Sequence, residues 1–521
     1  KDGRATTYSE PGACVLVAAP GGSQEESGLF TTDLIGSDGA NIFGFFPPFQ
    51  YLSDYMFNSI GFIGTSAAAP LVSGIAGILL QVNPALTARD VQQILLLSAQ
   101  PFDLGDPDLT RNGAGLLTGH NTGFGVVDAG EAARLAQRWV NRPVLEIHSL
   151  PPQEIARSIP DDGLKLLISG DDVPSELASM RTLPGTGPFA DEPMVGVPLR
   201  TVTDPANLAS GSLVNFGALL EYNSSRVVEQ LRQVGAAGAS FAVVYNCAAP
   251  SGAPCSLSVG LPLNGTDYTP IPAVFIGRTN GLNLVELFRT NTTAQARLQL
   301  TTADYSFGVT NQLSLEHVRV RLKTDHPLRG DLRITLRSPS GTRSVLQRLN
   351  DDTAPGPVDW IYMSTRHFFE ASEGEWTVSI SDLAEGQTGS VTYCELILHG
   401  VSITDTDRDG LDDQWEVANM GGLQKGAADR VQEDAYSLVR KFVAGMDPKV
   451  PAHAFRLELV EWKSDVARLS WPRGLGVEEL WSGADPALMS PGSTVESGTW
   501  ESVAFVPLTD RARFFQVRRV P

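Results

Sequence analysis

The chain has 521 residues, and its 39 basic against 59 acidic residues give a formal net charge of −20 at pH 7. This length exceeds what one hydrophobic core supports, so at about 150 residues per domain we expect three or four domains. The acidic balance argues against nucleic acid or an anionic membrane as a partner. We find no run approaching the roughly 18 apolar residues of a membrane span, and because Lys1 opens the chain with neither Met nor a signal peptide, we expect a fragment or a processed product.

Residues 62–80 combine a tight Gly-Thr turn with a run of small and apolar residues. This pattern predicts a helix that carries Ser66 in its first turn and packs closely on its neighbours. Backbone N–H groups without a helical acceptor lie there, at the positive end of the helix dipole, and they can stabilise a developing oxyanion. The alternative is that Thr65 and Ser66 merely cap a buried helix, because both residue types are common at helix starts.

Several stretches resemble the subtilisin-like serine proteases, and the kexin and furin branch in particular. They are Gly64 to Pro70, which matches the nucleophile segment Gly-Thr-Ser-x-Ala-x-Pro, the helix opening at 83–87, the closing segment 123–129, the apolar run 14–18 and the triplet 31–33. The resemblance implies that residues 1–141 are the C-terminal half of an α/β peptidase domain, with Ser66 as the nucleophile. The stretch 36–62, rich in Phe and Tyr, is expected to be either an insertion beside the cleft or a loop packed on its own domain.

All seven histidines come after Ser66 in the sequence. In the subtilisin family the acid, the base and the side-chain oxyanion donor all precede the nucleophile. A serine without a base is a poor nucleophile at neutral pH. We therefore expect this chain, which lacks the triad Asp and His, to be inactive alone.

Residues 142–400 show strand periodicity, with apolar Val318, Val320 and Leu322 alternating with basic residues. This alternation predicts a half-buried antiparallel sheet, most simply a β-sandwich. The sequences of residues 329–332, 338–342 and 374–376 resemble the P domain of proprotein convertases, which implies a jelly-roll-like sandwich. An α/β run over 165–303 interrupts it and resembles a protease-associated domain, without any catalytic constellation.

Asp405 to Glu416 fit a twelve-residue calcium loop position by position. The expected ligands are carboxylates at the first, third, fifth, ninth and twelfth positions and the backbone carbonyl at the seventh: Asp405, Asp407, Asp409, Asp413, Glu416 and Leu411. Gly410 supplies the sharp turn at the sixth position. The alternative is a solvated acidic turn.

The calcium segment, residues 401–450, resembles bacterial thrombospondin type 3-like repeats. A second copy, from Asp429 to Pro448 with a helix expected over 435–444, has lost most carboxylates, so we expect one Ca²⁺. The metal is expected to stiffen the join between the sandwich and the C-terminal residues. Residues 451–521 alternate again and predict a small C-terminal β-sandwich.

The four cysteines do not make a disulfide scaffold. Cys247 and Cys255 could close a small bridge, whereas Cys14 and Cys394 lie in apolar runs expected to be strands, where free thiols are commonly buried.

The sequence thus predicts a multidomain protein: the α/β subtilisin-like half, a β-sandwich P domain with an α/β insertion, a calcium-loop segment and a C-terminal β-sandwich. Its leading function is that of a secreted serine endopeptidase acting on protein or peptide substrates, from a bacterial source. The alternative is a non-catalytic, calcium-stiffened extracellular surface or adhesion protein with a relic protease half. Neither cleavage specificity nor oligomeric state can be deduced.

Overall fold

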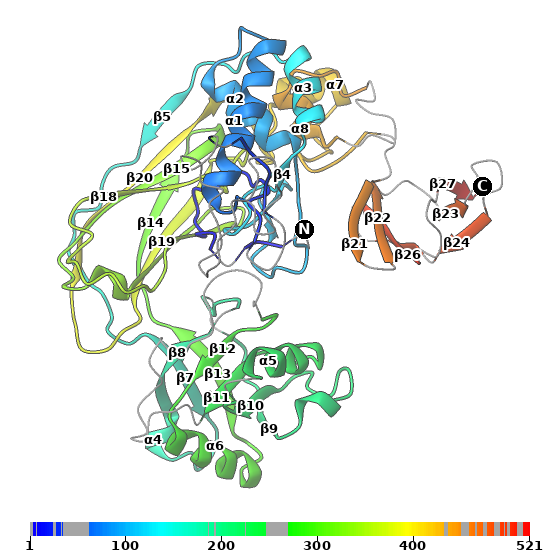
Figure 1. The fold of residues 1–521 in the computed structure, drawn as a ribbon. Helices are drawn as coiled ribbons and strands as arrows, with labels where there is room; N and C mark the ends of the chain where they lie inside the picture. Colours follow the sequence, from blue (N-terminus) through cyan, green and yellow to red (C-terminus); the bar gives the residue numbers. More distant parts are fainter. Residues whose placement is uncertain are drawn as a thin grey trace.

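The computed structural model consists of a peptidase segment, a β-sandwich with an inserted α/β unit, a short helical segment and a C-terminal pair of sheets (Figure 1). The structure describes residues 4–6, 8–23, 28–32, 34, 62–185, 187–191, 194–223, 226–245, 269–431 and 436–449, together with the backbone of the strands from 458 onward. The aromatic-rich stretch, Cys247 and Cys255 fall outside these residues.

The peptidase segment consists of three helices and short strand pairs. Its elements are α1 Thr65–Val82, α2 Ala88–Ser98, α3 Ala129–Arg138, β1 Ala99–Gln100, β2 Thr110–Arg111, β3 Leu117–Thr118 and β4 Val126–Val127. β1 pairs with β4 and β2 with β3, both antiparallel. A capping box fixes the start of α2, because the hydroxyl of Thr87 accepts from the N–H of Asp90 while the Asp90 carboxylate accepts from the N–H of Thr87.

The apolar run 14–18 does not form the expected strand. Within this run only Ala18 forms a β-bridge, to Val126, although the carbonyl of Leu16 also accepts from the N–H of Phe124 at 2.8 Å, and Cys14 is exposed rather than buried. Cys394 is buried in the sandwich, as expected. Apolar composition alone was misleading here because the run has just one pairing partner to extend it.

Helix α1 is far more exposed than its composition predicts. Only Ala67 and Leu79 are buried, and a Cβ added at Gly74 or Gly77 would meet no atom within 4 Å, so the expected close packing of its small residues is not found among the described residues. With 18 residues and a mean hydropathy of 1.5, α1 is also long and apolar enough to cross a bilayer. One such helix is weak evidence of a span, so the expected absence of a membrane span is weakly supported.

We expect the exposed apolar side chains of α1 to promote self-association of this chain. Leu71, Ile78 and Leu80 are 42%, 45% and 46% exposed. Replacing all three by Ser should reduce aggregation, measured by light scattering. Each replacement should change the free energy of unfolding by about 0.5 kcal/mol or less. The matched control is Leu79→Ala on the same helix, where Leu79 is 0% exposed and the loss should be about 2–5 kcal/mol. A triple variant as destabilised as this control would show that these three side chains are packed against the protein and not exposed.

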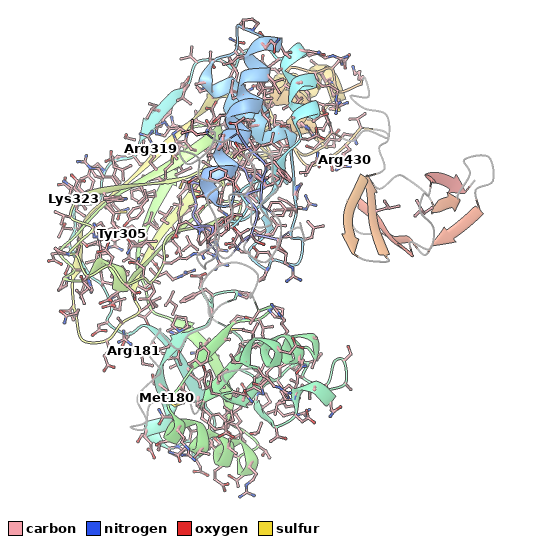
Figure 2. The ribbon with its side chains drawn as sticks, in the orientation of Figure 1. Met180, Arg181, Tyr305, Arg319, Lys323 and Arg430 are labelled. Carbon is pink, nitrogen blue, oxygen red and sulfur yellow. The ribbon has the colours of Figure 1, made fainter. Side chains whose placement is uncertain are left out.

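The middle of the chain forms a β-sandwich, which confirms the expectation for the P domain. Its strands are β5 Glu146–Ser149, β6 Arg157–Ser158, β14 Ala303–Val309, β15 Leu313–Thr324, β16 Leu332–Arg337, β17 Arg343–Gln347, β18 Trp360–Ser364, β19 Gly374–Asp382 and β20 Ser390–Ser402. One sheet has the order β14-β19-β16-β17 and the other β18-β15-β20-β5, with β6 beside β20. The alternation works as predicted, because Val318, Val320 and Leu322 point into the core while Arg319 and Lys323 lie on the outside (Figure 2).

An α/β unit is inserted between β6 and β14. It comprises β7 Leu164–Ser169, α4 Ser175–Ala178, β8 Ser179–Pro184, β9 Leu199–Val202, β10 Gly217–Glu221, α5 Val227–Ala236, β11 Ala242–Tyr245, β12 Ala273–Phe275, α6 Arg278–Thr290 and β13 Gln295–Leu300. The seven strands have the order β13-β7-β8-β12-β11-β10-β9, and β9 to β12 are mutually parallel. Arg181, at the junction with the sandwich in Figure 2, donates to the carboxylate of Asp161 at 2.7 Å.

The segment after the sandwich folds back onto the peptidase helices. Helices α7 Asp413–Met420 and α8 Leu438–Val443 lie beside α3 in Figure 1, and Leu438 and Val439 share one core with Leu135 of α3. The helix expected over 435–444 is therefore shorter, and the segment is not a simple spacer between two domains. Its apolar side chains are buried against a unit that lies about 300 residues earlier in the chain.

Beyond residue 457 the backbone forms two antiparallel sheets. The strands are β21 Glu458–Lys463, β22 Val466–Pro472, β23 Val477–Gly483, β24 Ser490–Ser493, β25 Val495–Ser497, β26 Glu501–Pro507 and β27 Phe514–Val520. Their orders are β21-β22-β26-β25 and β24-β23-β27.

Candidate catalytic serine and metal centre

Ser66 lies where the sequence predicts it, exposed in the first turn of α1. Gly64 immediately before the helix has φ 123°, a conformation that side chains other than glycine rarely adopt, and its carbonyl accepts from the N–H of Ala67 at 2.9 Å. The N–H groups of the first residues of a helix have no acceptor within it, so that of Ser66 is available to a ligand. The alternative, in which Thr65 and Ser66 cap a buried helix, does not match the structure, because the N-cap residue is Gly64, no side chain caps the helix and only Ala67 and Leu79 are buried.

The turn is held against the segment that precedes it in the fold. The N–H of Gly64 donates to the carbonyl of Gly21 at 2.9 Å, and Leu29 pairs with Phe62 through two backbone hydrogen bonds. Pro70 has no N–H, so the carbonyl of Ser66 lacks its usual donor inside the helix. These contacts fix where the serine hydroxyl stands.

His120 forms an Asp–His pair, but it cannot serve as the base for Ser66. Its Nδ1 lies 2.8 Å from the carboxylate of Asp108, and its Nε2 accepts the N–H of Val345 at 2.8 Å. The backbone donor requires a neutral Nε2, so Nδ1 carries the proton. Burial and the nearby Arg366 lower the pKa of His120 to about 4, which keeps the ring neutral at pH 7. Both ring nitrogens are thus occupied: Nδ1 pairs within the peptidase segment, and Nε2 joins this segment to the sandwich.

A second constellation has the order of a catalytic triad but is sealed. Ser344 Oγ lies 3.0 Å from His367 Nε2, and His367 Nδ1 lies 3.1 Å from Glu370. Ser344 and His367 are 0% exposed and Glu370 is 1% exposed, so no substrate reaches them. Their role is structural. Within the described residues, no hydrogen bond joins Ser66 to a histidine or a carboxylate.

The acidic loop is closed around two overlapping groups of carboxylates. Asp405, Asp407 and Asp413 place one oxygen each within 4.8 Å of one another, and so do Asp407, Asp409 and Glu416. Gly410 makes the expected turn with φ 91°, and a Cβ there would lie 2.3 Å from the carbonyl oxygen of Phe369. The five carboxylates that the sequence selects therefore converge.

Backbone donors hold the start of this loop in place. The carboxylate of Asp405 accepts from the N–H of Asp409 at 3.1 Å and from that of Gly410 at 3.0 Å. Asp413 accepts from the N–H of Thr406 at 2.9 Å, so one oxygen of its carboxylate already has a hydrogen-bond donor. Glu416 lies one turn into α7, so the helix fixes its direction.

The innermost oxygens have no partner among the described residues. Both carboxylate oxygens of Glu416 and Oδ2 of Asp409 are buried and unsatisfied. Burial, together with repulsion from the neighbouring aspartates, raises the pKa of Glu416 to about 8 and that of Asp409 to about 6. Buried carboxylates without donors are costly, and a hard cation bound by oxygen ligands is the partner that relieves them. The residues present fit a calcium ion.

Comparisons with known proteins agree with the peptidase segment and with the β-sandwich. Residues 1–125 match the Subtilase family and residues 315–398 match the Proprotein convertase P-domain. The chain is 24% identical over 337 residues to proprotein convertase subtilisin/kexin type 5 of Branchiostoma californiense, covering 62% of this chain and 12% of that protein. It is 25% identical over 381 residues to furin of Mus musculus, covering 73% and 31%. The chain thus spans less than a third of the length of these relatives.

A solved serine protease of Aeromonas sobria aligns with a TM-score of 0.42 at 18% identity, over 76% of this chain and 56% of that one. The fold and the two family matches together define a subtilisin-like protein with a P domain. The relatives matched here are proteases of the kexin/furin-like branch, and the family matches cover part of a peptidase domain and a P domain. The curated relatives named here are animal proteins, so the expectation of a bacterial source is not supported.

Proposed function

We propose that this chain is part of a serine endopeptidase in which Ser66 is the nucleophile. The observation that carries the proposal is the exposed position of Ser66 in the first turn of α1, after a glycine with positive φ, inside the subtilase match. Such a position gives a hydroxyl both access to substrate and an adjacent backbone donor.

In this proposal Ser66 Oγ attacks the scissile carbonyl of a protein or peptide, and the N–H of Ser66 donates to the oxyanion. A base takes the hydroxyl proton and passes it to the leaving amine, and water then hydrolyses the acyl-enzyme. The described histidines of this chain do not supply that base: none hydrogen bonds to Ser66, and His120 and His367 are committed elsewhere. We infer that the base and its aspartate come from a preceding segment, so that residues 1–521 alone are inactive.

The acidic loop is proposed to bind one Ca²⁺ through Asp405, Asp407, Asp409, Asp413, Glu416 and the carbonyl of Leu411. The ion would neutralise the carboxylates and fix the loop that packs on Phe369. Its role would be mechanical, and no catalytic step depends on it.

The α/β insertion is proposed to be a protease-associated module that binds or restricts substrate. The protein is proposed to be extracellular.

The nucleophile is tested on the full-length protein with a fluorophosphonate probe, which labels activated serines. Labelling and peptidase activity should be lost in Ser66→Ala. The control is Ser73→Ala on the same helix, where the hydroxyl donates to the carbonyl of Ala69, and this variant should label normally. Labelling that survives Ser66→Ala would rule out Ser66, and a full-length protein without activity would leave the adhesion alternative in its place.

A further inference from the structure

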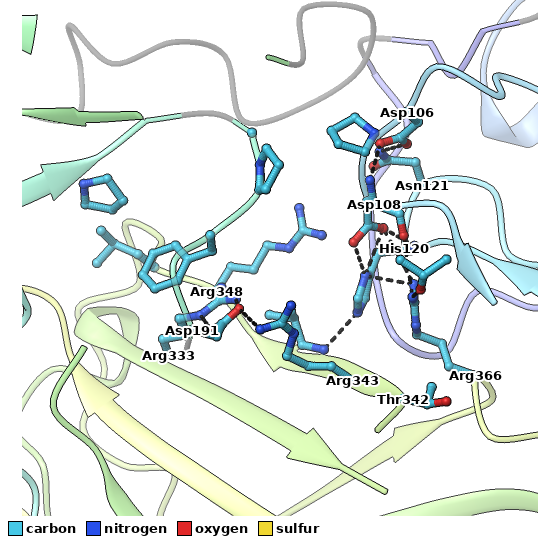
Figure 3. A pocket seen from close by; sticks show the side chains of 18 of the residues that line it. Asp106, Asp108, His120, Asn121, Asp191, Arg333, Thr342, Arg343, Arg348 and Arg366 are labelled. Carbon is cyan, nitrogen blue, oxygen red and sulfur yellow. Dashed lines mark hydrogen bonds and ion pairs between the residues drawn. The ribbon is translucent and has the colours of Figure 1, made fainter. Parts of the chain in front are cut away.

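An arginine-rich cavity lies where the peptidase segment, the sandwich and the insertion meet (Figure 3). Its volume is about 290 Å³, the size of a small-molecule site. Five arginines and three aspartates line it: Arg111, Arg333, Arg343, Arg348, Arg366, Asp106, Asp108 and Asp191. In a chain with a net charge of −20 this is a local excess of positive charge.

Most of these charges are paired with each other. Asp191 binds the guanidinium of Arg333 through both oxygens, at 2.8 and 2.9 Å, and also Arg343 at 2.9 Å. Asp108 is held by His120, with Arg366 at 3.6 Å. These pairs form two opposite walls of the cavity, as Figure 3 shows.

Arg348 is the exception. It extends from the sandwich into the space between the two walls (Figure 3), and its guanidinium makes no hydrogen bond and no ion pair with the described residues. Burial and the neighbouring Arg333 lower its pKa, and the carboxylates of Asp108, Asp106 and Glu10 oppose this shift without hydrogen bonding to it. The side chain of Arg348 is half-buried, and a bound anion would supply the charged hydrogen-bond partner that its guanidinium lacks among the described residues.

The rest of the lining selects among anions. Phe189, Val345, Leu349 and Leu383 supply apolar surface. A phosphate with two negative charges would face Asp106 and Asp108 with only one free cation among the described residues to balance it. A single carboxylate matches the fork of one guanidinium in charge and in geometry, and an apolar stem matches the remaining wall.

We propose that this cavity binds a small monocarboxylate with an apolar stem, whose carboxylate pairs with Arg348. The site is distinct from Ser66 and from the acidic loop, and it does not depend on either. Because it is built from three segments, its occupant would also hold the insertion against the sandwich.

The test uses the 521-residue chain and phenylacetate, with phenylacetamide as the uncharged isostere, by calorimetric titration and thermal shift at constant ionic strength. Phenylacetate should bind saturably and raise the unfolding temperature, and phenylacetamide should bind at least tenfold more weakly. In Arg348→Gln the affinity for phenylacetate should fall at least tenfold. The control Arg297→Gln changes an exposed arginine on β13 and should bind as the wild type does.

Three binding results would overturn the proposal. The first is the absence of saturable binding of phenylacetate, and the second is equal binding by Arg348→Gln. The third is tighter binding of inorganic phosphate, which would assign the cavity to another class of anion. Without ligand, Arg348→Gln should unfold at the same temperature as Arg297→Gln, because no partner is lost. A lower unfolding temperature would show that Arg348 is a structural cation and would also contradict the proposal.

Discussion

Adding Ca²⁺ to the metal-free 521-residue chain is expected to stabilise it, by about 2.7 kcal/mol at a concentration one hundred times the dissociation constant. The reason is that the ion binds the folded loop, where the oxygens of Glu416 are buried without donors, and not the unfolded chain. Calorimetric titration should give one site. Chelation with EDTA should reverse the stabilisation.

Glu416→Gln should weaken calcium binding by more than about 100-fold, since loss of a group that only orients a ligand already costs about 10- to 100-fold. Without metal the same variant should be at least as stable as the wild type, because it removes a carboxylate held among like charges. The control Glu375→Gln changes an exposed glutamate on β19 and should leave calcium binding unchanged. Equal binding by Glu416→Gln, or no heat in the wild type, would refute the site.

The pH dependence of this stabilisation has a definite sign. The pKa of Glu416 is raised to about 8 in the folded metal-free chain, above its ordinary value of 4.5. The folded state therefore holds a proton that the unfolded state releases, and the stability of the metal-free chain should fall as pH rises from about 5 to about 8. Calcium competes with that proton, so its affinity should rise over the same range. A calcium affinity independent of pH would contradict this assignment.

Glu370→Ala is expected to lower the free energy of unfolding by about 3–5 kcal/mol, the usual cost of removing one member of a buried charged pair. The Glu370 carboxylate accepts from the N–H of Gly113 at 2.7 Å and from the hydroxyl of Thr342, and it lies 3.1 Å from His367. It thus joins the peptidase segment to the sandwich, and its loss takes an acceptor from the buried side chains of Thr342 and His367 and from the N–H of Gly113. Denaturant unfolding measures the change.

The comparison variant is again on β19, where Glu375→Ala should cost about 0.5 kcal/mol or less. Burial opposes ionisation of Glu370, but His367, Thr342 and Gly113 outweigh it and hold the pKa below its ordinary value of 4.5. The stability from this carboxylate is therefore complete above that value and is lost as the pH falls through the lowered pKa. Glu370→Gln should flatten this acid limb. A Glu370→Ala variant as stable as Glu375→Ala would show that the contact is not needed.

The residues 365–371 form a junction loop on which the other units converge. Asn112 of the peptidase segment donates to the carbonyls of Arg366 and Phe368, at 3.0 and 2.9 Å. Gly410 of the acidic loop approaches the carbonyl of Phe369, whose ring lies in the core shared with the peptidase helices. The proposed calcium loop and the Glu370 network therefore contact the same element.

The sequence by itself determined the local features of this protein. Ser66 at the start of α1, the sharp turn at Gly410 and the alternation of β15 result from backbone conformations and short spacings that a few neighbouring residues fix. The family resemblance rests on the same kind of local pattern.

Only the tertiary structure decided which residues meet. The exposure of α1, the return of α8 to the peptidase helices, the hydrogen bond of Val345 to His120 and the unpaired Arg348 all depend on segments far apart in the chain. A sequence shows that Arg348 is charged but not whether a carboxylate stands beside it, because pairing and burial are set by the packing of separate units.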